Sequence, residues 1–192
     1  MEKRDFNILV ADDDEIVREV VASLLFQEGY RVVTASDGLD AIRLLRVETV
    51  HFVITDLRMP GADGIEVLRH AVRSNADTAV VILTAYGSLD TTLEAMKEGA
   101  FYYLTKPFRG QEIVLLSERA FQRAVLLSDN RELREHLKDT YRDIEIIKDV
   151  ARSRNGDITT HWLERLERLK NMSLLTEQEA DILRGRLIRD DG

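Results

Sequence analysis

Residues 8–15, Ile8-Leu9-Val10-Ala11-Asp12-Asp13-Asp14-Glu15, run from four apolar residues directly into four acidic ones. A short apolar run is typical of a buried strand, and acidic residues directly after it would lie together at the end of that strand. Two unit charges about 4 Å apart repel each other by roughly 4 kcal/mol at an effective dielectric of about 20. The stretch therefore predicts that a cation elsewhere in the sequence compensates these carboxylates.

Short apolar segments alternate with longer amphipathic segments over the first 120 residues. The apolar segments are 7–10, 31–34, 52–55, 79–83 and 102–104, and the amphipathic ones are 16–27, 38–47, 65–74, 89–97 and 111 onward. Near-continuous apolar strands separated by helices are typical of a parallel sheet covered on both faces. Gly29 and Gly99 follow two of the helical segments and fit left-handed C-caps. The pattern predicts an α/β fold with a five-stranded, doubly wound parallel sheet.

Polar residues stand where the predicted strands end. Asp12 and Asp13 follow the first strand, Asp56 ends the third, Thr84 ends the fourth and Lys106 follows the fifth. Ligands of open α/β sheets bind outside the carboxyl ends of the strands, so these residues are predicted to converge on one crevice. Three carboxylates and one ammonium make a hard-oxygen site, which suits Mg²⁺.

Such a crevice suits phosphoryl transfer, because a metal ion beside a free carboxylate and a cation can stabilise transfer onto that carboxylate. Asp56 is the best nucleophile, since it stands alone at a strand end while Asp12 and Asp13 can share the metal. The histidines share no ligand spacing and are expected to be structural or exposed. They are His51, His70, His136 and His161.

The motifs resemble those of a response-regulator receiver domain of two-component signalling, most closely the nitrogen-regulator subfamily. They are the pair Asp12-Asp13, Thr55-Asp56-Leu57-Arg58-Met59-Pro60-Gly61, Leu83-Thr84-Ala85-Tyr86-Gly87 and residues 99–108. The resemblance covers residues 5 to about 120 and implies a flavodoxin-like sheet of strand order 2-1-3-4-5. It also implies that Asp56 accepts a phosphoryl group from a histidine kinase, and that Asp12, Asp13, Asp56 and the backbone carbonyl of Arg58 hold Mg²⁺.

The same resemblance implies a conformational switch. Thr84 would move its hydroxyl onto a phosphoryl oxygen, Lys106 would pair with another, and the ring of Tyr103 would turn inward. A cis peptide bond before Pro107 is expected, which is reasonable because X-Pro bonds lose most of their trans preference. Tyr102 departs from the family, which often has Asp there, and it places two tyrosines side by side. Side chains alternate along a strand, so one ring should point inward and the other outward.

A phosphatase of the haloacid-dehalogenase type is an alternative, because Asp12-Asp13-Asp14 contains its D-x-D arrangement. Asp12 would then be the nucleophile. Ile16 stands where that family has Thr or Val, and the Asp56 block would have no role. Locating the acid-labile phosphate separates the two hypotheses.

A heptad pattern without proline or glycine continues the last receiver helix. Its positions are Leu126, Asn130, Leu133, Leu137, Thr140, Ile144, Ile147 and Ala151. Asn at an a position can fix the register of a parallel dimer, and the g-to-e′ pairs Asp129–Arg134 and Asp143–Lys148 are opposite in sign. The pattern predicts a homodimeric coiled coil from Leu126 to Ala151. The alternative is one amphipathic helix packed on its own receiver or tail.

Residues 153–157 break the helix, and two short helices are predicted at 160–171 and 176–188. Thr176 to Glu179 forms a capping box for the second. Leu163, Leu166 and Leu169 could face Leu175, Leu183 and Leu187 in a helical hairpin, and Trp162 could anchor it on an unidentified downstream protein or on the coiled coil. Residues 175–179 faintly resemble the start of a helix-turn-helix domain, but the net acidic tail is a poor match to phosphate, so we expect no DNA binding.

Composition limits the remaining function classes. The 192 residues are 44% hydrophobic, carry a net charge of −8 and include no cysteine, which excludes a disulfide scaffold and a Cys nucleophile. No apolar run approaches the roughly 20 residues of a membrane span, and the N-terminus lacks a signal peptide, so we expect a cytoplasmic protein. We expect a receiver domain at 1–122, a helical linker at 123–152, a hairpin at 153–192 and no enzymatic output.

Overall fold

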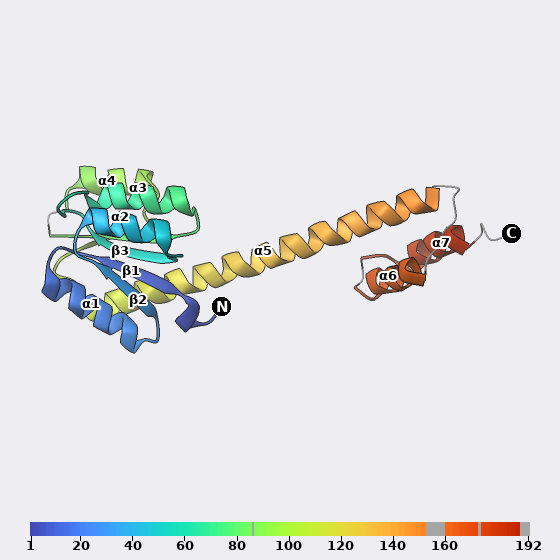
Figure 1. Cartoon of the computed structure of the whole chain (residues 1–192), viewed down its shortest axis with the longest axis horizontal. Coiled ribbons are helices and arrows are strands. Elements are labelled where there is room, and N and C mark those ends of the chain that lie inside the picture. Colours follow the sequence, from blue (N-terminus) through green and yellow to red (C-terminus); the bar gives the residue numbers. More distant parts are fainter. Residues whose placement is uncertain (86, 153–159, 173, 189–192) are drawn as a thin grey trace. The chain divides into compact units, whose positions relative to one another are not determined.

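The structure is a computed structural model that describes residues 1–85, 87–152, 160–172 and 174–188 (Figure 1). It divides the chain into two compact units, Met1–Asp129 and Asn130–Gly192, and the boundary falls inside one long helix. Each unit is described by itself. The finer division into segments 1–122, 123–152 and 153–192 stays a prediction.

The N-terminal unit contains a five-stranded parallel sheet of order β2-β1-β3-β4-β5. This confirms the predicted α/β fold and strand order. The strands are β1 Asn7–Ala11, β2 Arg31–Ala35, β3 Phe52–Asp56, β4 Ala79–Thr84 and β5 Tyr102–Thr105. Each extends one residue beyond its predicted apolar segment, because the sheet ladder continues into the small or polar residue that follows.

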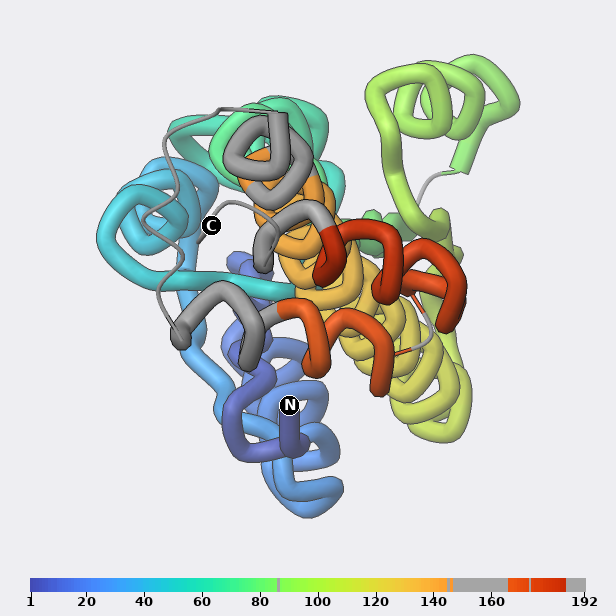
Figure 2. The backbone as a smooth tube through the Cα atoms, turned by 90° about the vertical axis from the view of Figure 1, so that its right-hand side faces the viewer, coloured from blue at the N-terminus to red at the C-terminus, as the bar shows by residue number. Residues whose placement is uncertain are grey.

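Helices cover both faces of the sheet, as Figures 1 and 2 show. A short 3-10 turn, Lys3–Asp5, precedes the sheet, and the helices of this unit are α1 Glu15–Gln27, α2 Gly38–Val47, α3 Gly64–Ser74, α4 Leu89–Lys97 and α5 Gly110–Arg152. Side chains of α1 and α5 bury one face, and those of α2, α3 and α4 bury the other. Such two-sided cover explains why the inner strands β3 and β4 are buried along their whole length.

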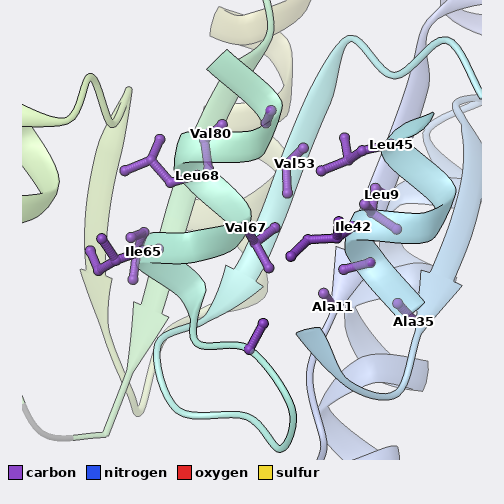
Figure 3. Close-up of a cluster of buried hydrophobic side chains, with 14 of the residues drawn as sticks. Leu9, Ala11, Ala35, Ile42, Leu45, Val53, Ile65, Val67, Leu68 and Val80 are labelled. Atoms are coloured by element: carbon purple, nitrogen blue, oxygen red, sulfur yellow. The ribbon is translucent and has the colours of Figure 1, made fainter. Parts of the chain in front are cut away.

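Successive side chains of the central strands point alternately into two cores, one on each face of the sheet. Leu9 of β1 and Val53 of β3 join the core beneath α2 and α3 (Figure 3), whereas Ile8 and Ile54 join the core beneath α1 and α5. Fully burying one such side chain contributes about 1.5–3 kcal/mol. The sheet is therefore a rigid support for the residues at its carboxyl edge.

Helix ends follow the predicted signals. The side chain of Asp14 caps α1 by accepting hydrogen bonds from the backbone N–H groups of Ile16 and Val17. Gly29 and Gly99, with φ of 87° and 95°, have the left-handed conformation expected after α1 and α4. The N-cap turns the chain directly after Asp12 and Asp13, so these acidic residues stay at the edge of the sheet.

The C-terminal unit is a helical hairpin together with the second half of α5. Its helices are α6 Thr160–Asn171 and α7 Glu177–Ile188, which agree with the predicted hairpin. The core consists of Leu166, Leu169, Leu175, Ala180 and Leu183, and Thr176 with Glu179 forms the predicted capping box. The predicted helix break at 153–157 and the side chains of Ile147, Ala151, Trp162, Leu163 and Leu187 lie outside the described residues. Within the described ranges, we find no helix long and apolar enough to cross a membrane.

Candidate functional site

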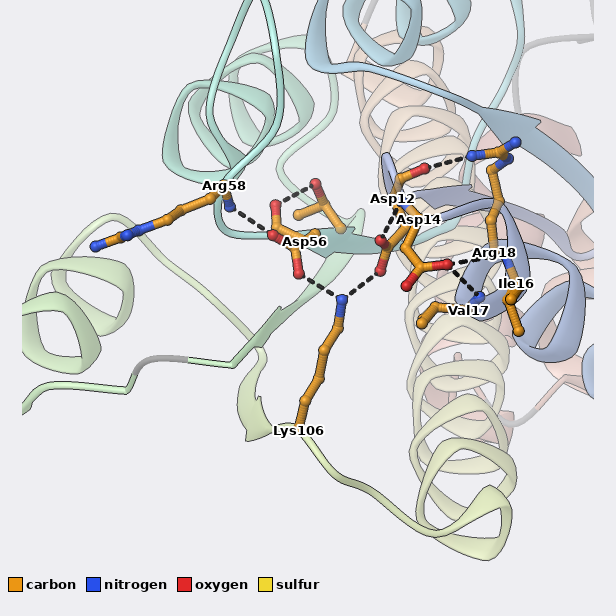
Figure 4. A network of polar contacts seen from close by, with 9 residues as sticks. Asp12, Asp14, Ile16, Val17, Arg18, Asp56, Arg58 and Lys106 are labelled. Atoms are coloured by element: carbon orange, nitrogen blue, oxygen red, sulfur yellow. Dashed lines mark hydrogen bonds and ion pairs between the residues drawn. The ribbon is translucent and has the colours of Figure 1, made fainter.

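An acidic cluster with one partly buried amine lies at the carboxyl edge of the sheet (Figure 4). The Lys106 Nζ atom lies 2.7 Å from Asp12 Oδ2 and 2.6 Å from Asp56 Oδ1. Asp12 is 1% exposed and Asp56 is 7% exposed. Strands β1 and β3 are neighbours and Lys106 follows β5, so the topology places the three residues at one edge of the sheet. The long side chain of Lys106 then reaches the two carboxylates.

The other carboxylate oxygens contact backbone N–H groups. Asp12 Oδ1 accepts a hydrogen bond of 3.0 Å from the N–H of Asp14, and Asp56 Oδ2 accepts one of 2.6 Å from the N–H of Arg58. Each of the four oxygens thus has one contact, whereas a carboxylate can accept about four hydrogen bonds in all. The two groups are held in place and retain lone pairs for a further ligand.

The charges of the cluster do not balance, because two carboxylates share one ammonium. Burial raises the pKa of Asp12, and the negative charge of Asp56 adds to this, against the opposing effect of Lys106. Burial alone would lower the pKa of Lys106, but its contacts with Asp12 and Asp56 outweigh this and raise it. Lys106 therefore stays protonated, inside a cluster whose net charge is negative.

Asp13 is not part of this polar network. Its side chain is exposed, and no group of three or more acidic or histidine residues able to hold a metal ion is found among the described residues. The predicted three-carboxylate cluster is thus present as two buried carboxylates with Lys106 between them. The donors that remain are hard oxygens, which fit Mg²⁺, an ion that needs only one or two carboxylates besides carbonyls and waters.

The predicted switch residues lie beside the cluster. Thr84 is buried at the end of β4, and its carbonyl accepts a hydrogen bond of 2.7 Å from the N–H of Lys106. Tyr103 packs on the core beneath α4, and its hydroxyl lies 3.0 Å from Thr91 Oγ1, whereas Tyr102 is 43% exposed. The predicted alternation of the two rings is confirmed, as is the cis peptide bond between Lys106 and Pro107.

Two further residues shape the site and were missed by the sequence analysis. A Cβ atom on Gly64 would lie 2.3 Å from the carbonyl oxygen of Asp56, so only glycine lets α3 begin so close to this strand end. Arg18 of α1 donates a hydrogen bond of 2.7 Å from Nη1 to the carbonyl oxygen of Asp12 (Figure 4). The signal for Arg18 was available, since it is the first basic residue after the acidic run.

Replacing Arg18 by Ala should loosen the turn that carries Asp12 and Asp13. A hydrogen bond from a charged group contributes about 1.5–3 kcal/mol, so urea denaturation should show a loss of about that size. The Mg²⁺ concentration for half-saturation, followed by fluorescence, should rise severalfold. Arg46→Ala on the exposed side of α2 is the matched control. Equal stability and equal Mg²⁺ response in both variants would show that Arg18 does not position this turn.

Comparison with known proteins identifies the family. The response regulator receiver domain model matches residues 8–118. The transcriptional regulatory protein ZraR of Klebsiella oxytoca is 41% identical over 119 residues, which are 62% of this chain and 27% of ZraR. The DNA-binding transcriptional regulator NtrC of Escherichia coli K12 is 36% identical over 113 residues, which are 59% of this chain and 24% of NtrC. The matched part thus spans about a quarter of these relatives.

Solved structures agree. A response regulator receiver domain protein from Clostridium thermocellum is 37% identical with a TM-score of 0.60, over 64% of this chain and 98% of that chain. The beryllofluoride-activated NtrC4 receiver domain dimer is 30% identical with a TM-score of 0.57, over 60% of this chain and 96% of that chain. The matched receiver coincides with the sheet, the helices that cover it and the acidic cluster at its edge, and the chain therefore belongs to the response regulator receiver domain family of two-component systems, with a nitrogen-regulator-like receiver.

Proposed function

We propose that the chain is a phosphorylation-controlled switch in which Asp56 accepts a phosphoryl group from a histidine kinase. The observation that carries the proposal is the placement of Asp56, a buried carboxylate at a strand end with one oxygen on Lys106 and the other on the Arg58 N–H. Such a carboxylate is held in one orientation and has its charge partly compensated. Both conditions help an oxygen of Asp56 to attack a phosphorus atom, because they orient the carboxylate and reduce its repulsion from the phosphoryl oxygens.

In the transfer, an oxygen of Asp56 forms a bond to phosphorus while the phosphorus–nitrogen bond of a phosphohistidine breaks. The imidazole nitrogen keeps the electron pair and takes up a proton. Lys106 remains protonated because its pKa is raised, so it can exchange one carboxylate contact for a phosphoryl oxygen without losing its charge. Lys106 thereby stabilises negative charge both before and after the transfer.

Asp12, Asp13, Asp56 and the backbone carbonyl of Arg58 would hold Mg²⁺ beside the acceptor. The bound ion supplies positive charge that offsets the phosphoryl oxygens in the transition state. Asp12 and Asp56 are the buried carboxylates of this set, and Asp13 lies at the solvent side. The rigid Asp12 would fix the position of the ion, and the exposed Asp13 would complete its shell.

Phosphorylation would add about −1.5 to −2 of charge at Asp56, which must be met by nearby donors. We propose that the hydroxyl of Thr84 binds a phosphoryl oxygen and that Tyr103 leaves Thr91 and turns inward. Since Thr91 belongs to α4, loss of the 3.0 Å contact would remove one link between α4 and β5. The surface formed by α4, β5 and α5 would then change, and that surface includes the exposed Leu89, Leu93 and Met96.

The output proposed for this change is contact between proteins rather than catalysis. The seam from Leu126 to Ala151 would form a homodimer, and the tail would bind a downstream protein. Two observations support the dimer: the exposure of Leu126 and Leu133 on α5, and the NtrC4 receiver, whose structure is that of a dimer. Because α5 runs without a break from the receiver into the seam, a change at its start can alter pairing further along.

Incubation with acetyl phosphate tests the acceptor function. The wild-type chain should gain one phosphoryl group in the presence of Mg²⁺, measured by intact-mass spectrometry, and incorporation should fall by about a hundredfold or more when EDTA removes the metal. Equal incorporation with and without Mg²⁺ would contradict the proposed metal site. No incorporation under any condition, in a chain shown to be folded by circular dichroism, would contradict the acceptor function itself.

A further inference from the structure

The predicted dimer seam of α5 has two differently covered parts. Leu126 and Leu133 are 63% and 59% exposed, and Leu137 is also exposed. Thr140 is only 9% exposed, although its heptad position continues the same stripe. A single helix cannot bury its own side chain to this degree, so atoms outside α5 cover the stripe at Thr140.

The chain's own tail packs on the same stripe one turn further along. Ile144, one turn beyond Thr140, packs against the core of the hairpin, which includes Leu166 of α6 and Leu183 of α7. The two helices of the hairpin share an apolar core of their own, and two exposed ion pairs also link them: Lys170 lies 2.9 Å from Glu177 and Arg184 lies 3.3 Å from Glu167. By packing on Ile144, the hairpin occupies a position that a coiled-coil partner would need.

We propose that the seam of α5 has two competing occupants: a second copy of this chain on residues 126–137, and the chain's own α6–α7 hairpin on Thr140 and Ile144. The inference rests on the proposed dimer. It adds the part of α5 on which the dimer forms and the hairpin that competes for the rest of the seam. A second copy suits the exposed part, because Asn130 stands at an a position and Asp129 and Arg134 are opposite in charge at g and e′. The hairpin thus limits how far two α5 helices can pair.

The length of the free seam matters because two helices pair more strongly when more heptads are in contact. Residues 126–137 amount to less than two heptads, whereas a coiled coil is typically sustained over at least about three to four heptads. Release of the hairpin would extend the seam to residue 151. Since the apparent affinity is reduced by the fraction of chains whose site is open, a bound hairpin weakens the dimer without touching its first half.

Two full-length variants of α7 test the competition. Leu183→Asp places a charge in the hairpin core, whereas Ile182→Asp changes the neighbouring residue, which is 57% exposed. Analytical ultracentrifugation should show that Leu183→Asp dimerises about tenfold more tightly than wild type, because more seams are open, and that Ile182→Asp behaves like wild type. Unchanged or weaker dimerisation of Leu183→Asp would overturn the competition, whether the hairpin core has unfolded or only loosened.

Two variants of α5 separate this inference from the proposed dimer. Leu133→Asp on the seam should abolish dimerisation in both the wild-type and the Leu183→Asp backgrounds, and Ile146→Asp, off the seam, should leave it intact. If Leu133→Asp changes nothing, the proposed dimer fails. Hydrogen exchange of residues 140–146 in the monomeric Leu133→Asp chain then reports the hairpin alone: added Leu183→Asp should raise exchange severalfold, and equal exchange would refute the intrachain contact.

Discussion

Asp56→Asn should reduce phosphoryl incorporation from acetyl phosphate by about a thousandfold or more, because an amide oxygen is a poor nucleophile compared with a carboxylate. The fold should survive the change. The amide has the shape of the carboxylate, and its oxygen can still accept the hydrogen bond from the Arg58 N–H. Intact-mass spectrometry measures the incorporation, and urea denaturation confirms that the variant is folded.

Asp12→Asn is the matched control, since Asp12 is also buried and contacts the same Lys106. It should weaken the Mg²⁺ response but leave Asp56 able to carry the label. A phosphatase that uses Asp12 as nucleophile predicts the reverse: Asp12→Asn would lose the label and Asp56→Asn would keep it. Peptide mapping after reductive trapping of the acyl phosphate identifies the labelled residue, and a label on Asp12 would refute the receiver mechanism.

The sequence was most informative where local pattern and tertiary environment agree. The bounds of α2, Gly38–Val47, and α4, Leu89–Lys97, coincide with their predicted segments. Both helices have polar N-caps and an amphipathic pattern, so nothing in the tertiary structure opposes the local signal. The meeting of Asp12, Asp56 and Lys106 was also predictable, since parallel strands place their carboxyl ends on one edge.

The features that the sequence did not predict depend on distances between residues, which a sequence pattern does not encode. Asp12 and Asp13 are adjacent and chemically identical, but only Asp12 points into the cluster, because the turn capped by Asp14 directs neighbouring side chains apart. The approach of Gly64 to Asp56 is a contact between the first residue of α3 and the last residue of β3. The stripe on α5 predicted apolar cover but not its source, and Ile144 is covered by α6 and α7 of the same chain.

Lys106→Met should lower the free energy of unfolding by about 3 kcal/mol at pH 7 in the presence of EDTA, because removing one partner leaves buried carboxylates without a counter-charge. Met preserves much of the length and apolar volume of the Lys stem. Urea denaturation measures the change, and Lys97→Met on the exposed side of α4 is the control for loss of a charge elsewhere. A variant as stable as wild type would show that the two carboxylates do not need the amine.

The stability loss caused by Lys106→Met should depend on pH. Burial raises the pKa of Asp12, so the folded state binds a proton more readily than the unfolded chain and loses stability as pH rises from the ordinary carboxyl range through the raised pKa. Without Lys106 the pKa of Asp12 rises further, so the penalty should shrink as pH falls from 7 towards 5. Asp12→Asn added to Lys106→Met should restore most of the lost stability at pH 7, because a neutral amide removes the repulsion with Asp56. A penalty that grows on acidification, or a double variant no more stable than Lys106→Met, would refute charge imbalance as the cause.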